Sequence, residues 1–229
     1  MMQKSSVSFV PSTGSRLAGS VAALLLTLAI AAAPLWGLPD PSDSVLLICY
    51  FSLVTTGFLA DLPRTWLRVP AEQPESGSLY FRTALVGGLL LLLMQWSSIA
   101  EVCVFQTQPI TSITLAGLAI AICGCGIRMT AVATLGESFV SGPHGCELVT
   151  TGIYRYLRHP SELGLLLICA GLVLALGAWR SAVVFGPLVL LTSFIRMQEE
   201  ERWLLRCKSD LYAGYRERTG RLLPKFSGF

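Results

Sequence analysis

The sequence predicts an all-α, polytopic membrane helical bundle with about five or six transmembrane segments. Hydrophobic residues make up 53% of the 229 residues and charged residues only 14%, whereas a soluble domain usually carries about 25% charged residues. Apolar runs recur along the chain, and a helix of about 20 apolar residues crosses the ~30 Å hydrocarbon core of a bilayer. One compact bundle accounts for this length, so we expect a single integral membrane domain over 1–229.

The apolar runs mark the expected helices in chain order. The first run is too long for the core of a signal peptide, so we expect it to be retained as a membrane helix. The last two runs have ~15 residues each, or about 22 Å as helix. They are short for full crossings, so we expect them to form a C-terminal helical hairpin. The runs cover 17–38, 44–60, 79–105, 110–132, 163–177 and 181–194, with N-terminal spans in 17–133 and a C-terminal core and tail in 134–229.

The distribution of basic residues predicts the orientation of these helices. Cytoplasmic loops of membrane proteins are enriched in Lys and Arg. With the N-terminus in the cytoplasm, the two loops near Asp40 and Gln106 lie outside and carry no basic residue. Only Arg180 breaks the pattern. The inside positions then include Arg64, Arg68, Arg128, Arg155, Arg158 and the basic tail from Arg196 onward. We therefore expect a multi-pass protein of a bacterial inner (plasma) membrane, with both termini cytoplasmic.

Composition also argues against two other classes of function. The basic tail lacks the aromatic interleaving and the fold module of a nucleic-acid binder, so we expect no nucleic-acid partner. The seven cysteines have neither metal-ligand spacing nor the arrangement of a disulfide framework, and we expect no metal site. The sequence leaves the oligomeric state open.

Two polar clusters flank the expected hairpin, at 150–164 and at 196–205. A hairpin returns the chain to the side that it left, so the two clusters are expected to lie close together. In the first cluster, Arg158 and His159 can hold a carboxylate or a phosphate. In the second, the glutamate triplet Glu199, Glu200 and Glu201 can hold an amine or ribose hydroxyls. Of the three we expect Glu200 to be the functional one, and Arg196 shares its helical face. S-adenosylmethionine has both a carboxylate and an ammonium group, and would suit this arrangement.

The order of motifs in this region resembles that of a known family. The segments "LVTTGIYRYLRHPSELG", "EERWL" and "YAGYRERTGRLLP" follow one another within 128–224. They are similar to the LVT-x-G-[IV]-Y, RHP-x-Y-x-G and EE-x-x-L motifs, and to the Y-x-x-Y segment ending in R-x-x-P, of the isoprenylcysteine carboxyl methyltransferase family. Related membrane phospholipid methyltransferases share them. Each motif alone is weak, but their order and spacing around a hairpin are specific.

The resemblance implies an integral membrane methyltransferase that uses S-adenosylmethionine, held in a pocket under the cytoplasmic loops. It implies a lipid or prenylated small-molecule acceptor that enters from the membrane, with an isoprenylcysteine carboxylate as the first expectation. The core at 134–229 would then be the methyltransferase core. Arg196 matches a family arginine placed near the substrate. Carried over by position, the cofactor contacts fall on Leu148, Val149, Tyr154, Arg158, His159, Pro160, Ser161 and Glu200.

One position departs from the family pattern within the site. Glu162 stands where RHP-x-Y-x-G has a tyrosine. A carboxylate or thiolate acceptor needs no general base, whereas an amine acceptor must lose a proton, and Glu162 could then serve as the base. Arg196 and Glu162 are therefore the candidate catalytic residues. Lys208 and Ser209 also replace the Phe-Gly usual after EE-x-x-L.

Three functions compete at this point. The first is the methyltransferase, with a phospholipid amine or a thiol as alternative acceptors. The second is a membrane NADPH-dependent reductase of the sterol reductase type, whose RHP motif usually continues with asparagine. Ser161 stands at that position here, and EE-x-x-L is present, which favours the transferase. The third is a non-enzymatic scaffold, which would leave the paired polar clusters unexplained.

Overall fold

A computed structural model describes residues 77–105, 111–135 and 148–225. Every regular element within these ranges is a helix, so the all-α prediction is confirmed for the described part of the chain. The expected spans at 17–38 and 44–60 lie outside the described residues. The elements are α3 (Gly77–Phe105), α4 (Ser112–Leu135), the 3-10 helix η4 (Gly152–Arg155), α5 (Pro160–Leu176), α6 (Trp179–Cys207) and α7 (Ser209–Arg218).

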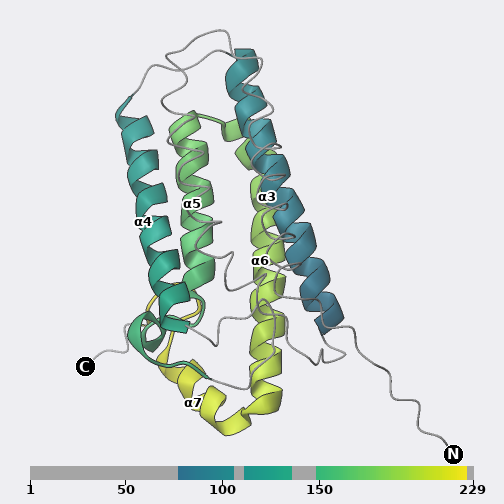
Figure 1. Cartoon of the computed structure of the whole chain (residues 1–229), viewed down its shortest axis with the longest axis vertical. Helices are drawn as coiled ribbons and strands as arrows, with labels where there is room; N and C mark the ends of the chain where they lie inside the picture. Colours follow the sequence, from purple (N-terminus) through teal and green to yellow (C-terminus); the bar gives the residue numbers. More distant parts are fainter. Residues whose placement is uncertain (1–76, 106–110, 136–147, 226–229) are drawn as a thin grey trace, which may run out of the picture.

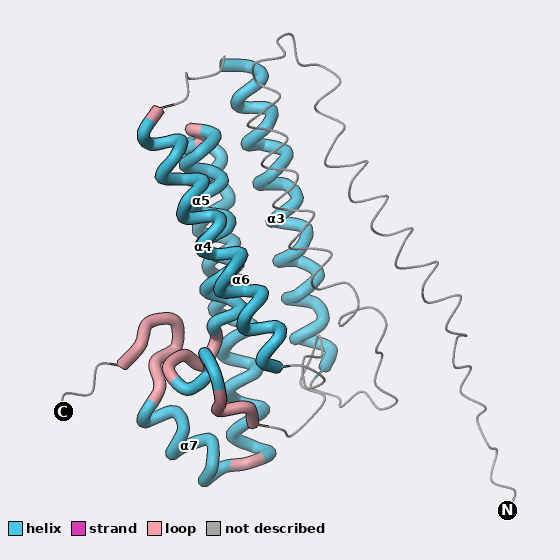
Figure 2. The backbone as a smooth tube through the Cα atoms, turned by 60° about the vertical axis from the view of Figure 1, so that its left-hand side comes forward, coloured by secondary structure: helices cyan, strands magenta, loops and turns pink. Residues whose placement is uncertain are grey.

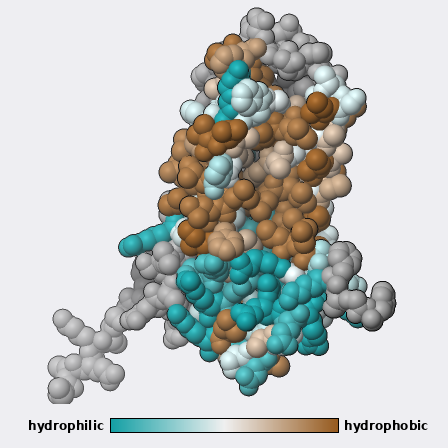
Figure 3. All heavy atoms as spheres, turned by 180° about the vertical axis from the view of Figure 1, so that it is seen from behind, coloured by the Kyte–Doolittle hydropathy of each residue, from teal (hydrophilic) through white to brown (hydrophobic). Residues whose placement is uncertain are grey.

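The four long helices α3, α4, α5 and α6 run side by side, and α7 lies at one end of them (Figures 1 and 2). Hydrophobic side chains cover the length of the helices, whereas hydrophilic side chains gather at the α7 end (Figure 3). By length and composition, α4 and α6 could each cross a membrane, and shorter apolar helical stretches occupy Val86–Val102 and Pro160–Leu176. The molecule therefore has an apolar shaft, formed by the apolar lengths of α3, α4, α5 and α6, and a polar cap at the end where α7 lies.

Helices α4 and α5 approach closely because small residues line the surface between them. A Cβ atom added at Gly124 would lie 2.7 Å from the carbonyl oxygen of Gly164, and one added at Gly164 would lie 2.7 Å from that of Gly124. Gly117 and Gly171 repeat this arrangement further along the same pair of helices. Small residues let helix backbones pack closely inside a membrane. This contact holds the start of α5, which carries the first polar cluster, against α4.

We expect Gly124→Ala to lower the free energy of unfolding by about 1–3 kcal/mol, because the added methyl group has no space between the two backbones. Gly126→Ala is the matched control on the same helix, since nothing lies within 4 Å of an added Cβ there. Apparent midpoints of thermal unfolding in detergent measure both changes. Equal midpoints for the two variants would contradict close packing at Gly124.

The connection between α5 and α6 is a tight turn, as expected for a hairpin. Gly177 ends α5 in the left-handed conformation, with φ of 64°, and Ala178 N–H donates to the Val173 carbonyl at 3.0 Å. These are the features of a Schellman motif. The expected hairpin is nonetheless wrong in one respect, because its arms do not pair along their length. Instead, α5 packs mainly on α4, and α6 packs mainly on α3.

The prediction of two short helical arms is wrong for the second arm. The expected run at 181–194 is only part of α6, which continues to Cys207. The apolar run ends where the helix enters the polar cap, and the hydropathy pattern does not reveal that the helix itself goes on. As a consequence, α6 carries Glu199, Glu200 and Glu201 out of the apolar shaft within one continuous helix.

Glu101 of α3 anchors the start of α6 at the end of the bundle opposite the cap. Its carboxylate accepts hydrogen bonds from the backbone N–H groups of Arg180 at 3.2 Å and Ser181 at 2.9 Å. The Arg180 guanidinium forms an ion pair with the same carboxylate at 3.4 Å. The first N–H groups of a helix lack partners within it, so Glu101 satisfies two of them. It also offsets the charge of Arg180, the arginine that breaks the predicted charge pattern.

Candidate active site

The segment between η4 and α5 presents the Arg-His-Pro motif at the polar end of the bundle. Tyr154 is buried, and its carbonyl oxygen accepts a hydrogen bond from the Tyr215 hydroxyl at 2.7 Å. The same hydroxyl lies 3.2 Å from the Leu157 carbonyl oxygen. Burial raises the pKa of Tyr215 to about 12, so this hydroxyl remains a donor at neutral pH. One side chain of α7 therefore holds the backbone that leads into the motif.

A second restraint comes from the residues that follow α7. Arg158 N–H donates to the Gly220 carbonyl at 2.8 Å, and His159 N–H donates to the Arg221 carbonyl at 3.1 Å. Leu157 and Gly220 form an isolated parallel bridge. The segment after α7 thus lies alongside the motif and brings the Arg221 side chain to the end of α6.

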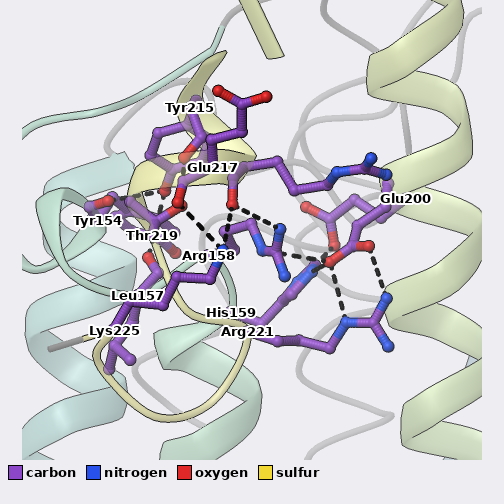
Figure 4. A network of polar contacts seen from close by, with 12 residues as sticks. Tyr154, Leu157, Arg158, His159, Glu200, Tyr215, Glu217, Thr219, Arg221 and Lys225 are labelled. Carbon is purple, nitrogen blue, oxygen red and sulfur yellow. Dashed lines mark hydrogen bonds and ion pairs between the residues drawn. The ribbon is translucent and has the colours of Figure 1, made fainter. Parts of the chain in front are cut away.

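Arg158, His159 and Arg221 converge in the polar network at this end of the molecule (Figure 4). Glu201 is the centre of this network, because all three side chains contact its carboxylate. Its carboxylate accepts hydrogen bonds from Arg221 at 3.0 Å and 2.6 Å and from His159 Nε2 at 3.1 Å. The Arg158 guanidinium lies 3.4 Å away. Glu201, His159 and most of Arg158 are buried. A buried carboxylate must be paired to be tolerated, and here three cations from two separate segments pair with one glutamate.

His159 sits between two carboxylates of α6. Nε2 contacts Glu201, and Nδ1 lies 3.5 Å from Glu200 Oε2. Burial by itself lowers the pKa of the imidazole, but the hydrogen bonds and charges of Glu200 and Glu201 outweigh that effect and raise the pKa to about 9. His159 is therefore an imidazolium at neutral pH, and both ring nitrogens donate.

A second contact between α5 and α6 lies one helical turn closer to the apolar shaft. Glu162 Oε2 lies 3.8 Å from Arg196 NH2. On the neighbouring face of α5, the Arg128 guanidinium of α4 donates to the Ser161 carbonyl at 3.1 Å and to its hydroxyl at 3.2 Å. Side chains from three helices therefore converge on the first turn of α5.

The structure brings most of the sequence-predicted site residues together. The predicted proximity of the two polar clusters is confirmed by the contacts of His159 with Glu200 and Glu201. Arg196 and Glu200 both reach α5, as expected from their shared helical face. Leu148 and Val149 lie half-buried on the segment that leads into η4. Of the predicted set, Tyr154, Arg158, His159, Pro160, Ser161 and Glu162 follow one another from η4 into α5.

Sequence reasoning missed the residues that hold this arrangement. Glu201 carries the network, although Glu200 was the glutamate selected from the triplet. Arg221 and Tyr215 were missed as well. Arg221 is the first residue of the R-x-x-P segment and Tyr215 the second tyrosine of Y-x-x-Y, so the motifs contained a usable indication. The charge pattern placed Arg128 on the cytoplasmic side, but no pattern indicated that it contacts Ser161.

Comparisons with known proteins identify the family of this chain. The sequence profile of the isoprenylcysteine carboxyl methyltransferase family matches residues 117–206. The chain is 33% identical over 171 residues to protein-S-isoprenylcysteine O-methyltransferase of Schizosaccharomyces pombe, which covers 66% of this chain and 69% of that protein. It is 32% identical to protein-S-isoprenylcysteine O-methyltransferase B of Arabidopsis thaliana, over 47% of this chain and 57% of that protein. A rat relative of the same name is matched over 45% of its length.

A solved structure shares the fold. It is that of the eukaryotic intramembrane Ras methyltransferase, isoprenylcysteine carboxyl methyltransferase, with a TM-score of 0.54 and 21% sequence identity. The match covers 96% of this chain and 80% of that chain. The resemblance read from the motifs is confirmed, and the reductase and scaffold alternatives are not favoured. The extent of the match to the yeast relative, together with the profile over residues 117–206, establishes that this chain is an integral membrane methyltransferase of the isoprenylcysteine carboxyl methyltransferase family.

Proposed function

We propose that this chain transfers the methyl group of S-adenosylmethionine to the carboxylate of a prenylated cysteine. The names of the relatives support this acceptor, since each is a protein-S-isoprenylcysteine O-methyltransferase. The observation that carries the proposal is the meeting of the two polar clusters, where His159 lies against Glu200 and Glu201. This meeting places charged groups of both signs at the border of the apolar shaft, where a charged cofactor and an apolar acceptor can meet.

The chemistry of these groups fits S-adenosylmethionine. Glu200 touches His159 but its side chain is 46% exposed, so its carboxylate can also accept from an ammonium group or a ribose hydroxyl. The start of α5 offers backbone N–H groups and the Ser161 hydroxyl to a carboxylate. When bound, the cofactor supplies a methyl group on a positively charged sulfur. The residues proposed to hold it are Leu148, Val149, Tyr154, Arg158, His159, Pro160, Ser161 and Glu200.

The chain's own residues are proposed to position the acceptor. Arg196 holds the acceptor carboxylate, and Glu162 lies beside Arg196. A carboxylate oxygen of the acceptor attacks the methyl carbon in line with the breaking carbon–sulfur bond, whose electron pair stays on sulfur. The products are a methyl ester and S-adenosylhomocysteine, and no proton is transferred. Catalysis then depends on holding the two reactants in line and on excluding water.

We further propose a single domain with five or six membrane segments and both termini in the cytoplasm of a bacterial inner membrane. The basic residues of the cap support this orientation, because cytoplasmic faces are enriched in Arg and Lys. The ion pair between Arg180 and Glu101 at the opposite end supports this orientation as well. Glu101 offsets the charge of Arg180, which is the basic residue that departs from the predicted charge pattern. Exposed basic residues of the cap are Arg155, Arg202, Arg206, Arg216, Arg218 and Lys225.

Ligand-dependent stability of the purified protein in detergent tests the cofactor. We expect S-adenosylhomocysteine to raise the midpoint of thermal unfolding and NADPH to leave it unchanged, because a ligand of the folded state stabilises by about 2.7 kcal/mol at 100 times its Kd. Glu200→Gln should weaken this response. Glu199→Gln, a change of the neighbouring glutamate that pairs with Arg202, should retain it. Stabilisation by NADPH alone would refute the proposed cofactor.

A further inference from the structure

Exposed side chains gather at the joint between η4 and the segment that follows α7. The joint is the parallel bridge between Leu157 and Gly220, and Gly220 N–H donates to the Tyr156 carbonyl at 3.3 Å. Lys225 closes the segment back onto α7, because its Nζ donates to the Arg216 carbonyl at 3.1 Å. We call the exposed side chains at this joint the strap surface: Arg155, Tyr156, Arg216, Arg218, Leu223 and Lys225.

The strap surface is positively charged. None of the ion pairs in the described part of the chain includes its basic residues, which are Arg155, Arg216, Arg218 and Lys225. Glu217 is exposed between two of the arginines and offsets part of their charge. The remaining charge suits an anionic partner.

Two large apolar side chains are exposed among these cations. Tyr156 is 58% exposed and Leu223 is 75% exposed. Tyrosine is enriched where a membrane meets water, because its ring is apolar and its hydroxyl is polar. Basic residues combined with exposed apolar side chains are typical of a surface that lies on anionic lipids.

The first turn of α5 gives the depth of the strap surface in the membrane. Arg128 and Arg196 reach this turn from α4 and α6, and the apolar lengths of α5 and α6 end there. His159, whose N–H donates to the Arg221 carbonyl, precedes Glu162 by about 5 Å along the helix axis. The headgroup layer of one leaflet is about 5–8 Å thick. The segment after α7 therefore lies at the depth of the lipid headgroups.

We propose that the strap surface binds the headgroups of anionic phospholipids in the membrane that the protein spans, and that this contact holds the segment after α7 in place. That segment supplies the Arg221 side chain to Glu201. It also supplies the carbonyl groups that accept from the N–H groups of Arg158 and His159. Anionic lipid therefore stabilises the candidate active site from outside. This inference goes beyond the proposed function and does not depend on which acceptor is methylated.

The full-length protein in lipid nanodiscs tests this inference without any acceptor. One set of nanodiscs contains phosphatidylcholine alone, and in the other phosphatidylglycerol replaces part of it. We expect the anionic lipid to raise the midpoint of thermal unfolding by roughly 4–8 °C and to slow hydrogen exchange of the Arg158 and His159 amides. Both effects should shrink in about 1 M salt, where the Debye length falls to about 3 Å.

Two exposed arginines provide a matched pair of variants. Arg155 and Arg206 each lie in the last turn of a helix. Arg206, however, lies about 15 Å from Arg196 along α6, beyond the headgroup layer. Arg155→Glu should reduce both effects of phosphatidylglycerol by at least about half, because it removes two of four positive charges. Arg206→Glu, with the same change of charge, should leave them unchanged.

The outcomes decide the inference separately from the proposed function, because neither measurement involves methyl transfer. Equal midpoints and exchange rates in the two kinds of nanodisc overturn it, as does an equal reduction by Arg155→Glu and Arg206→Glu. Polyglutamate added to the phosphatidylcholine nanodiscs represents an acidic polypeptide. If polyglutamate slows the exchange and phosphatidylglycerol does not, the partner is a polypeptide and the inference is overturned. Should Arg155→Glu fail to fold, Arg155→Gln decides, and an undiminished response there overturns the inference.

Discussion

Replacing Glu201 with glutamine is expected to lower the free energy of unfolding by about 3–5 kcal/mol, the usual cost of removing one partner of a buried charge cluster. Glutamine leaves the shape of the side chain nearly unchanged but removes the negative charge that Arg158, His159 and Arg221 share. Arg158 and Arg221 then lose the carboxylate that offsets their charges, and His159 keeps only its contact with Glu200. Chemical unfolding in detergent measures the loss, and the response to S-adenosylhomocysteine should disappear because the Arg-His-Pro segment is no longer held.

The glutamate triplet contains its own control for this prediction. Glu199 pairs with Arg202, whose side chain is 60% exposed, and exposed ion pairs contribute about 0–1 kcal/mol. Glu199→Gln should therefore change the unfolding free energy little, although it removes the same charge two positions away. If both variants lose the same free energy, the loss reflects net charge in the cap, and Glu201 is not its centre.

The stability of the protein is expected to fall as pH rises from about 6.5 through the His159 pKa of about 9. The folded state binds the proton more tightly than the unfolded state, so the contribution is complete below the unfolded pKa and is lost as the folded group deprotonates. A difference of this size corresponds to on the order of 3 kcal/mol. The groups that face the imidazole are Glu200 and Glu201 of α6, and Arg158 and Arg221 contact the same Glu201 carboxylate.

Unfolding midpoints at pH 6, 7.5 and 9 test this expectation in the wild type and in His159→Gln. The variant should be less stable at the lowest pH and should show a much shallower decline toward the highest. The chain has two histidines, so His144→Gln separates their contributions. If the decline in stability persists in His159→Gln but vanishes in His144→Gln, the titrating group is His144 and the prediction is contradicted.

The arrangement of the site also shows why the motifs are spread along the chain. The Arg-His-Pro segment enters α5, the glutamates lie in the C-terminal part of α6, and the R-x-x-P segment follows α7. Backbone hydrogen bonds from Arg158 and His159 to the segment at Gly220 and Arg221 join the first motif to the last. The glutamates lie between them. Changes to any of these segments should therefore affect the same site.

The composition and motif order determined a large part of this protein without the structure. The shortage of charged residues predicts membrane helices because lipid excludes unpaired charge, and α3, α4 and α5 closely match the expected apolar runs. The hairpin between the polar clusters predicts their proximity from chain geometry alone. The family follows from the order of the motifs along the chain and from the spacing between them.

Only the tertiary structure decided which glutamate of the triplet matters. Successive residues of an α-helix point about 100° apart, so Glu199, Glu200 and Glu201 face three directions. Which of them points inward depends on the rotation of α6, and that rotation is set by packing on α3 and by the approach of Arg221. These contacts join residues far apart in the chain, and no local pattern encodes them. For the same reason, the sequence identified Glu162 as unusual, but only the structure placed it beside Arg196 and showed that its Oε1 has no hydrogen-bond partner among the described residues.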